Sequence, residues 1–296
     1  MEMNTCIDSI IFGDNQFFGI NHMSESKAKK LDEKFKDMKS ISEVIDMAYD
    51  IGINAFMLNT HDRALDICNY FRSNSARYPD LRLYPSMPYA HKYANAVAEN
   101  GIFGALKDLI FTDSSTKDIF RMLTKGGSII FDKDIVKVMK ILIDIEMKIF
   151  RDLNVRVIFL QNIVTDLLLG FGVKEAFREF ASYIREKYKV EPGFITLNMP
   201  RLVDFLIECE IENPIVCSAI NYAGYFMNPD TESYEKTIKE KRFRPIAMSI
   251  FASGAVRPDT AINYVCQKLK IKTIVFGASN QNHIFETKQL FEKYNF

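Results

Sequence analysis

A short apolar run, a polar tip and an amphipathic helix follow one another eight times along this chain of 296 residues. The apolar runs cover 9–12, 55–58, 81–84, 156–160, 194–197, 215–219, 246–249 and 273–276. Runs that are apolar throughout, rather than at alternate positions, are typical of parallel strands buried on both faces. Helices between such strands form right-handed crossovers. Eight such units in a chain of this length predict a (β/α)8 TIM barrel.

The stretches between the runs refine this prediction. A lysine-rich insertion, 24–39, follows the first run, and helical patterns over 91–100, 102–111, 116–124 and 132–153 separate the third run from the fourth. Ser40 and Glu43 form a capping-box pattern, which predicts a helix from Ser40 to Asp50. No Pro/Gly/Ser-rich linker divides the chain, so we expect residues 1–296 to form a single barrel domain.

The alternative α/β architecture is an open, doubly wound sheet. Its usual sign is a GxGxxG turn after the first strand. Here that turn runs from Gly13 to Gly19 as GDNQFFG and lacks the middle glycine. The sequence therefore favours the barrel.

The composition excludes several classes of partner. Lys plus Arg and Asp plus Glu both number 38, and this zero net charge argues against non-specific nucleic-acid binding and against a polybasic membrane anchor. No apolar run reaches the ~18 residues of a membrane span, and the stretch from Met1 to Asp8 has no basic n-region of a signal peptide. The five cysteines are widely spaced without a CxxC pair, as is typical of reduced thiols. We expect a cytoplasmic protein without nucleic-acid or membrane partners.

Amide side chains follow five of the eight runs, at the end where a barrel carries its binding site. An amide donates and accepts hydrogen bonds without charge, so this ring predicts a substrate-binding surface for a polar small molecule. The alternative is that Asn simply favours the turn positions at strand ends. The candidate substrate-binding residues are Asn15, Gln16, Asn59, Gln161, Asn162, Asn198, Asn221 and Tyr222.

The tips after the seventh and eighth runs are small and polar, and each precedes a helix. Small residues let a ligand approach backbone N–H groups, and a helix N-terminus favours negative charge. The loops after strands seven and eight are also the usual phosphate site of barrels. We expect an anion there, although tight turns favour small residues in any case. The candidate phosphate- or cofactor-binding residues are Ser253, Gly254, Gly277, Ala278, Ser279, Asn280 and His283, with Arg257 as an added cation.

Four segments of the chain resemble the aldo-keto reductases. They are 10–19, which is similar to that family's first strand and glycine-containing loop, 43–54, 245–254 and 275–286. The last is the most specific, because Gly277, Ser279, His283 and Glu286 match the spacing of the family's nucleotide-binding segment. The resemblance implies a (β/α)8 barrel and allows an NADP or NAD cofactor.

The catalytic tetrad of that family does not carry over. Met57 stands at the position of the family's acid and Asp62 at that of its tyrosine. The third run ends in Ser86 rather than lysine, and Gln161 stands where the fourth strand should carry histidine. Without the tyrosine and lysine, that family's route for protonating a carbonyl as hydride arrives is absent. The resemblance is therefore to a divergent barrel that lacks the family's catalytic tetrad.

His61 and Asp62 follow the second run, and Asp14 follows the neighbouring first run. An acid, a base and a carboxylate at one barrel mouth predict acid–base chemistry. The same three side chains could instead hold a divalent metal. In a third interpretation, Asp62 caps the following helix and His61 lies on the surface.

Three hypotheses for function follow. The first is a barrel enzyme that acts by acid–base chemistry on a small phosphorylated or nucleotide-linked, and therefore anionic, substrate. The second is an NAD(P)-binding oxidoreductase with an altered catalytic tetrad. The third is a non-catalytic ligand-binding or scaffold protein on a degenerate barrel.

Overall fold

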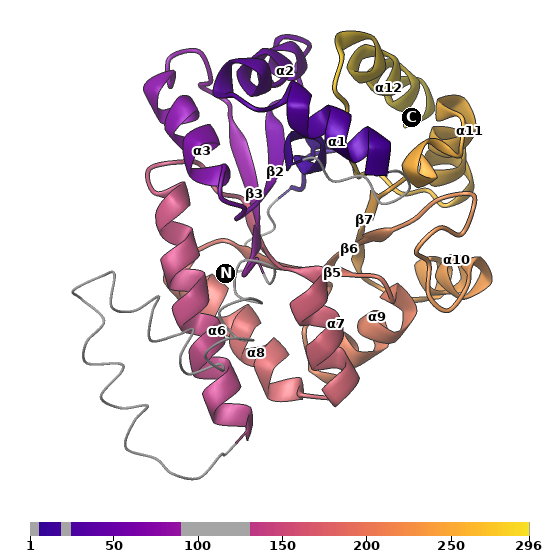
Figure 1. Cartoon of the computed structure of the whole chain (residues 1–296). Helices are drawn as coiled ribbons and strands as arrows, with labels where there is room; N and C mark the ends of the chain where they lie inside the picture. The colour runs from indigo at the N-terminus through magenta and orange to yellow at the C-terminus, as the bar shows by residue number, and fades with distance from the viewer. Residues whose placement is uncertain (1–5, 19–24, 90–130, 296) are drawn as a thin grey trace.

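Eight parallel strands close into a barrel in the computed structural model, which describes residues 6–18, 25–89 and 131–295. Each strand pairs with its neighbours in chain order, and β1 closes the ring on β8, as Figure 1 shows from the end of the barrel. The strands are β1 (Ile10–Phe12), β2 (Ala55–Asn59), β3 (Arg82–Met87), β4 (Val157–Leu160), β5 (Glu191–Thr196), β6 (Ile215–Ala219), β7 (Arg244–Met248) and β8 (Ile274–Phe276). The predicted (β/α)8 TIM barrel is confirmed.

Helices surround the barrel and bury their apolar faces against it (Figure 1). They are α1 (Glu25–Lys34), α2 (Met38–Asp50), α3 (Ala64–Ser73), α6 (Phe131–Met147), α7 (Asn162–Phe171), α8 (Lys174–Tyr183), α9 (Met199–Glu208), α10 (Thr231–Glu240), α11 (Pro258–Asn263) and α12 (Gln281–Tyr294). The predicted pattern over 132–153 corresponds to α6 and a short 3-10 turn, Lys148–Phe150. The helices expected over 91–124 lie outside the described residues.

Side chains alternate between the two surfaces of the barrel wall, because successive residues of a strand point to opposite faces. One apolar cluster fills the interior and includes Met57, Tyr84 and Phe159. A larger cluster lies between the strands and the helices. The same alternation turns the next inward positions, Asn59 and Ser86, toward the carboxyl end of the barrel. This end carries the polar side chains described below.

Several predicted boundaries differ from those of the structure, and two of the differences matter here. The helix expected to begin at Ser40 begins at Met38, and its N-cap is Asp37, whose Oδ1 accepts a hydrogen bond from the Ser40 backbone N at 2.9 Å. The third strand does not end at 84 but continues to Met87. Pro85 has no backbone N–H, yet β2 and β3 remain paired up to Asn59 and Ser86. Ser86 is therefore a strand residue rather than part of the loop.

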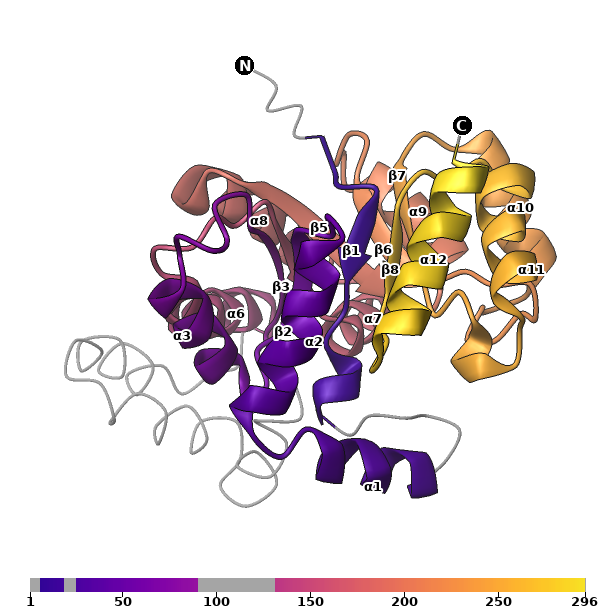
Figure 2. The same ribbon diagram turned by 90° about the horizontal axis from the view of Figure 1, so that it is seen from above.

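The predicted insertion after the first strand contains α1, which lies across the carboxyl end of the barrel (Figure 2). Arg63, in the loop after β2, donates hydrogen bonds to the carbonyl oxygens of Phe17 and Phe35, on either side of α1. Lys34, at the end of α1, donates to the carbonyl oxygen of Ser279 after β8. These contacts fix α1 between the first and the last units of the barrel.

Among the described residues, no helix is both long and apolar enough to cross a lipid bilayer.

Candidate functional site

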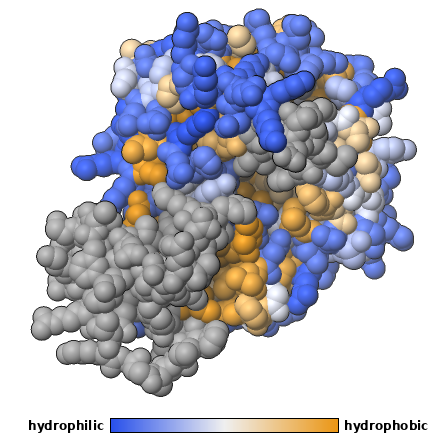
Figure 3. Space-filling model, in the orientation of Figure 1, coloured by the Kyte–Doolittle hydropathy of each residue, from blue (hydrophilic) through white to orange (hydrophobic). Residues whose placement is uncertain are grey.

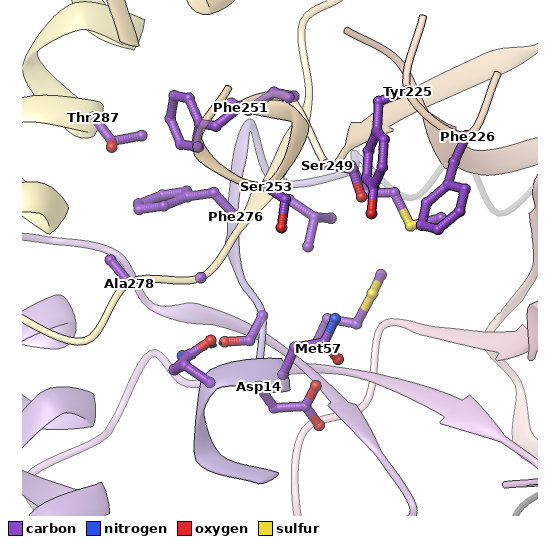
Figure 4. A pocket seen from close by; sticks show the side chains of 18 of the residues that line it. Asp14, Met57, Tyr225, Phe226, Ser249, Phe251, Ser253, Phe276, Ala278 and Thr287 are labelled. Atoms are coloured by element: carbon purple, nitrogen blue, oxygen red, sulfur yellow. Dashed lines mark hydrogen bonds between the residues drawn. The ribbon is translucent and has the colours of Figure 1, made fainter. Parts of the chain in front are cut away.

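A cavity of about 940 Å³ opens at the carboxyl ends of the strands. All eight strand-and-loop units contribute to its lining, and the first turns of α7 and α12 complete it. Figure 4 shows Asp14 and Met57 on one wall, facing Tyr225, Ser249 and Ser253 across the open space. The site therefore lies where the barrel fold is expected to place it.

Asp14 is a buried carboxyl group on this wall, with 2 % of its surface exposed. Its Oδ2 accepts a hydrogen bond from the Asn59 backbone N at 2.5 Å, and its Oδ1 accepts one from Asn59 Nδ2 at 2.8 Å. Burial raises the pKa of Asp14 to about 7, and the Asn59 hydrogen bonds only partly oppose that shift. A carboxyl group with this pKa can give or take a proton near neutral pH.

Ser86 lines the same cavity one strand beyond Asn59. Its backbone is the register partner of Asn59 on β2, so the two residues are adjacent across the sheet. Ser86 is fully buried and lines the cavity, yet its Oγ has no hydrogen-bond partner among the described residues. Unsatisfied buried hydroxyl groups are uncommon, and this one belongs to a residue at the cavity wall, where a ligand can supply the missing partner.

The loop after β3 is held from behind by a buried carboxylate. Glu146 of α6, only 1 % exposed, accepts hydrogen bonds from Thr60 Oγ1 and from the Tyr89 backbone N. Tyr89 lines the cavity, and burial together with the charges of Asp14 and Asp62 raises the pKa of its hydroxyl. Glu146 thus joins the two loops that carry Asn59 and Tyr89.

The three predicted acid–base residues do not converge. Only Asp14 lines the cavity. The His61 ring stacks on Phe18 with centroids 4.2 Å apart and meets the Tyr89 ring edge-on at 5.5 Å, and Asp62 is exposed. The residue before them, Thr60, does not line the cavity either; its Oγ1 donates to Glu146 of the surrounding helix α6.

The predicted ring of amides is met in part. The cavity lining includes Asn15, Gln16, Asn59, Gln161 and Asn162. The other three predicted substrate-binding residues lie outside the lining, in local structural roles. Asn198 caps α9, Asn221 is hydrogen-bonded to both backbone groups of Tyr225, and Tyr222 is exposed against the Tyr264 ring. Asn198 and Asn221 thus occupy the turn and cap positions that Asn favours, and Tyr222 packs against another ring at the rim.

The predicted anion loops lie on the opposite side of the cavity, where Ser253, Gly254, Gly277, Ala278, Ser279 and His283 join its lining. Ser253 and Gly254 have φ angles of 59° and 93°, and a Cβ on Gly254 would meet nothing within 4 Å, so a ligand can approach this backbone closely. Arg257 and Glu286 also line this end. Asn280 does not, because its side chain caps α12 by accepting from the His283 backbone N.

Residues that the sequence did not single out complete the walls. Ser86 was not predicted as a site residue because the third strand was expected to end at Tyr84. Ser86 is two residues beyond Tyr84, so in a continuing strand it points to the same, inward face. Tyr225 and Phe226, in the loop after β6, place two rings in contact beside the mouth, with centroids 4.2 Å apart and planes inclined by 35°. Nothing in the local sequence distinguishes this pair from other loop aromatics.

No metal cluster is present among the described residues, where no three His, Cys, Asp or Glu side chains come together as a metal ion requires.

Comparisons with known proteins give the fold a family likeness. Solved structures similar to this chain include a proposed aldo-keto reductase from Pseudomonas aeruginosa, with a TM-score of 0.57 and 9 % identity over 97 % of this chain and 91 % of that one. A proposed 2,5-diketo-D-gluconic acid reductase B has a TM-score of 0.57 and 10 % identity over 97 % and 82 %. An aldo-keto reductase of the silkworm, Bombyx mori, has a TM-score of 0.56 and 10 % identity over 98 % and 83 %. The chain has an aldo-keto reductase-like barrel.

These identities establish the fold and nothing finer. No family model matches the sequence, and no curated protein matches it either. Met57, Ser86 and Gln161 line the cavity, and Asp62 is exposed outside its lining.

Proposed function

We propose that this protein is an oxidoreductase that binds a nicotinamide dinucleotide, NAD or NADP, in the cavity at the barrel mouth. The observation that carries the proposal is that one continuous cavity joins the buried carboxyl group of Asp14 to the loops after β7 and β8 and to the first turns of α12. A reduced nicotinamide, when bound, supplies a hydride to a carbonyl carbon.

The residues present fit such a cofactor. The volume of about 940 Å³ lies at the upper end of the roughly 300–1,000 Å³ range of ligand pockets, as a dinucleotide beside a small substrate requires. The open backbone at Gly254 and the cation of Arg257 suit a phosphate group, and Glu286 can accept from sugar hydroxyls. Tyr225 offers a flat ring face to an aromatic ligand.

The acid–base hypothesis has less support than this redox alternative. It rests on His61 and Asp62, which lie outside the cavity lining. The structural neighbours whose names state an activity are reductases. A phosphorylated substrate is not required, because the anion loops suit the phosphates of the cofactor equally well.

Titration of the full chain with NADPH and with NADH, followed by nicotinamide fluorescence and calorimetry, tests the proposal. We expect saturable binding in the micromolar range. Arg257→Ala should weaken it about tenfold through the loss of one charge-assisted hydrogen bond. Arg242→Ala, which changes an exposed arginine away from the cavity, is the matched control.

Absence of saturable binding by the folded protein would refute the cofactor. Stabilisation by inorganic phosphate alone would then return the acid–base hypothesis to first place. Binding of no anion at all would favour a scaffold or a non-catalytic binding protein.

A further inference from the structure

We propose that Asp14 and Ser86 together form the site for the substrate oxygen, in place of the missing tetrad, with Asp14 as the proton donor and Ser86 as the hydroxyl that holds the oxygen. This inference rests on the proposed function. It assigns the acid of the reaction to the loop after β1 and a partner hydroxyl to the end of β3.

Asn59 lies between Asp14 and Ser86. Its backbone N and its Nδ2 donate hydrogen bonds to the two carboxyl oxygens of Asp14, and its backbone pairs in register with that of Ser86. Both side chains line the cavity, and both are almost completely buried. The backbones of Asn59 and Ser86 lie about 4.8 Å apart, as in any pair of neighbouring strands. The Asp14 carboxyl group is within hydrogen-bond distance of Asn59 from the other side, so a ligand that contacts Asn59 lies near both groups.

The buried hydroxyl group of Ser86 is unsatisfied among the described residues. Its Oγ has no partner in the described part of the chain, whereas the neighbouring buried Thr60 hydroxyl is bonded to Glu146. Leaving a buried donor unpaired costs stability, unless a ligand supplies the acceptor. A carbonyl or alcohol oxygen in the cavity is such an acceptor.

Apolar side chains surround part of the cavity that Asp14 and Ser86 line. Met57, Ile195, Leu197 and Met248 line the cavity along with these two groups, and Ile163 of α7 stands at its rim. Figure 3 shows apolar surface in the region of α7, whose exposed residues include Ile163, Leu167 and Phe171, and of these three Ile163 lines the cavity. Apolar surroundings of this kind disfavour the charged form of the Asp14 carboxyl group, which therefore stays protonated near neutral pH, and they strengthen the hydrogen bonds made there.

The charged and titratable groups around Asp14 are compatible with this role. Tyr89 faces it from the loop after β3, with His61 and Asp62 behind that ring. Glu146 is bonded to Thr60 and to the Tyr89 backbone. Arg257, His283 and Glu286 belong to the other end of the same lining.

A bound reduced nicotinamide would supply the hydride by giving up a C–H bond and would itself be oxidised, while the carbonyl carbon would be reduced. The π electrons of the carbonyl bond would move to oxygen, and the Asp14 carboxyl proton would pass to that oxygen to give an alcohol. Asp14 is left as a carboxylate and recovers its proton from water. Ser86 Oγ donates a hydrogen bond to the oxygen throughout.

The test uses benzamide, an aromatic carbonyl compound that is not reduced, as a binding probe for the full chain. Calorimetry at pH 6 and pH 8 should give about tenfold tighter binding at pH 6, because Asp14 is mostly protonated there. Asp14→Asn should remove this pH dependence. Ser86→Ala should weaken binding about fivefold at both pH values, since one hydrogen bond is lost.

Reduction of benzaldehyde with NADPH is the second readout. Asp14→Asn should lower kcat at least about 100-fold, the usual effect of losing a general acid, while NADPH affinity stays unchanged. The matched controls are Asp80→Asn and Ser75→Ala, which change exposed residues of the same types. Thermal unfolding of each variant confirms that it is folded.

The outcomes separate the two proposals. Benzamide binding that ignores pH and both substitutions, or no benzamide binding at either pH, overturns the oxygen site even if NADPH binds. Failure of NADPH to bind, with benzamide binding as expected, overturns the proposed oxidoreductase and leaves Asp14 and Ser86 as a ligand site.

Discussion

Burial of Asp14 gives its carboxyl group a pKa near neutrality but lowers the free energy of unfolding of the protein at neutral pH. Its carboxyl group is buried beside an apolar wall, and burial raises its pKa from 3.8 to about 7. The folded protein therefore holds a proton that the unfolded chain has already released at intermediate pH. Stability contributed by this proton is present below about pH 4 and is lost as the pH rises through about 7.

Asp14→Asn is predicted to change this pH dependence. The amide resembles the protonated acid, so the free energy of unfolding of the variant should be close to that of the wild type below about pH 4 and should not vary with the ionisation of this group at higher pH. Between pH 5 and pH 8 the wild type should lose about 2–3 kcal/mol relative to the variant. Urea denaturation at both pH values measures the difference, and parallel pH profiles of the two proteins would contradict the raised pKa.

At the scale of elements, the packing of β4 against β5 depends on a glycine, which leaves room for an aromatic ring of the neighbouring strand. Gly193 of β5 is the register partner of Phe159 of β4. A Cβ on Gly193 would lie 2.4 Å from the Phe159 ring, which is fully buried in the barrel interior. The glycine is thus needed for the approach of the ring.

Gly193→Ala is therefore expected to destabilise the protein by about 1–3 kcal/mol, the usual effect of overpacking a core. Gly170→Ala in α7 is the matched control, because a Cβ there meets nothing within 4 Å. It should leave stability unchanged or raise it by up to about 1 kcal/mol, since alanine favours the helix. Thermal and urea unfolding of both variants check the prediction. Equal stability of the two would contradict the packing argument.

For the whole molecule, closure of the barrel ties the two ends of the chain together. β1 pairs with β8, and α1 reaches the loop after β8 through Lys34 and Ser279. Removing any one strand would expose two unpaired sheet edges. This connection predicts that the units of the barrel lose structure together.

Unfolding in urea should accordingly appear as one cooperative transition for the whole chain. Far-UV circular dichroism and the fluorescence of the 13 tyrosines, in a chain without tryptophan, should give coincident curves. Two separate transitions would show that residues 1–296 are not a single folding unit.

Much of this protein can be predicted from its sequence because it depends on local pattern. Eight apolar runs with helices between them leave few architectures other than a closed parallel barrel. The small residues after the last two runs identify the loops that line one end of the cavity, and Asp14 follows the first strand directly. These features need only the order of residue types along the chain.

The composition of the other wall was decided by the tertiary structure. Whether His61 or Ser86 faces the cavity depends on where a strand ends and on which side chain a distant helix holds. Glu146 of α6 holds the Thr60 side chain toward that helix, and β3 extends to Met87 beside β2. The pKa of Asp14 likewise depends on burial by residues from several strands. Such effects come from packing between segments far apart in the chain, which no local pattern records.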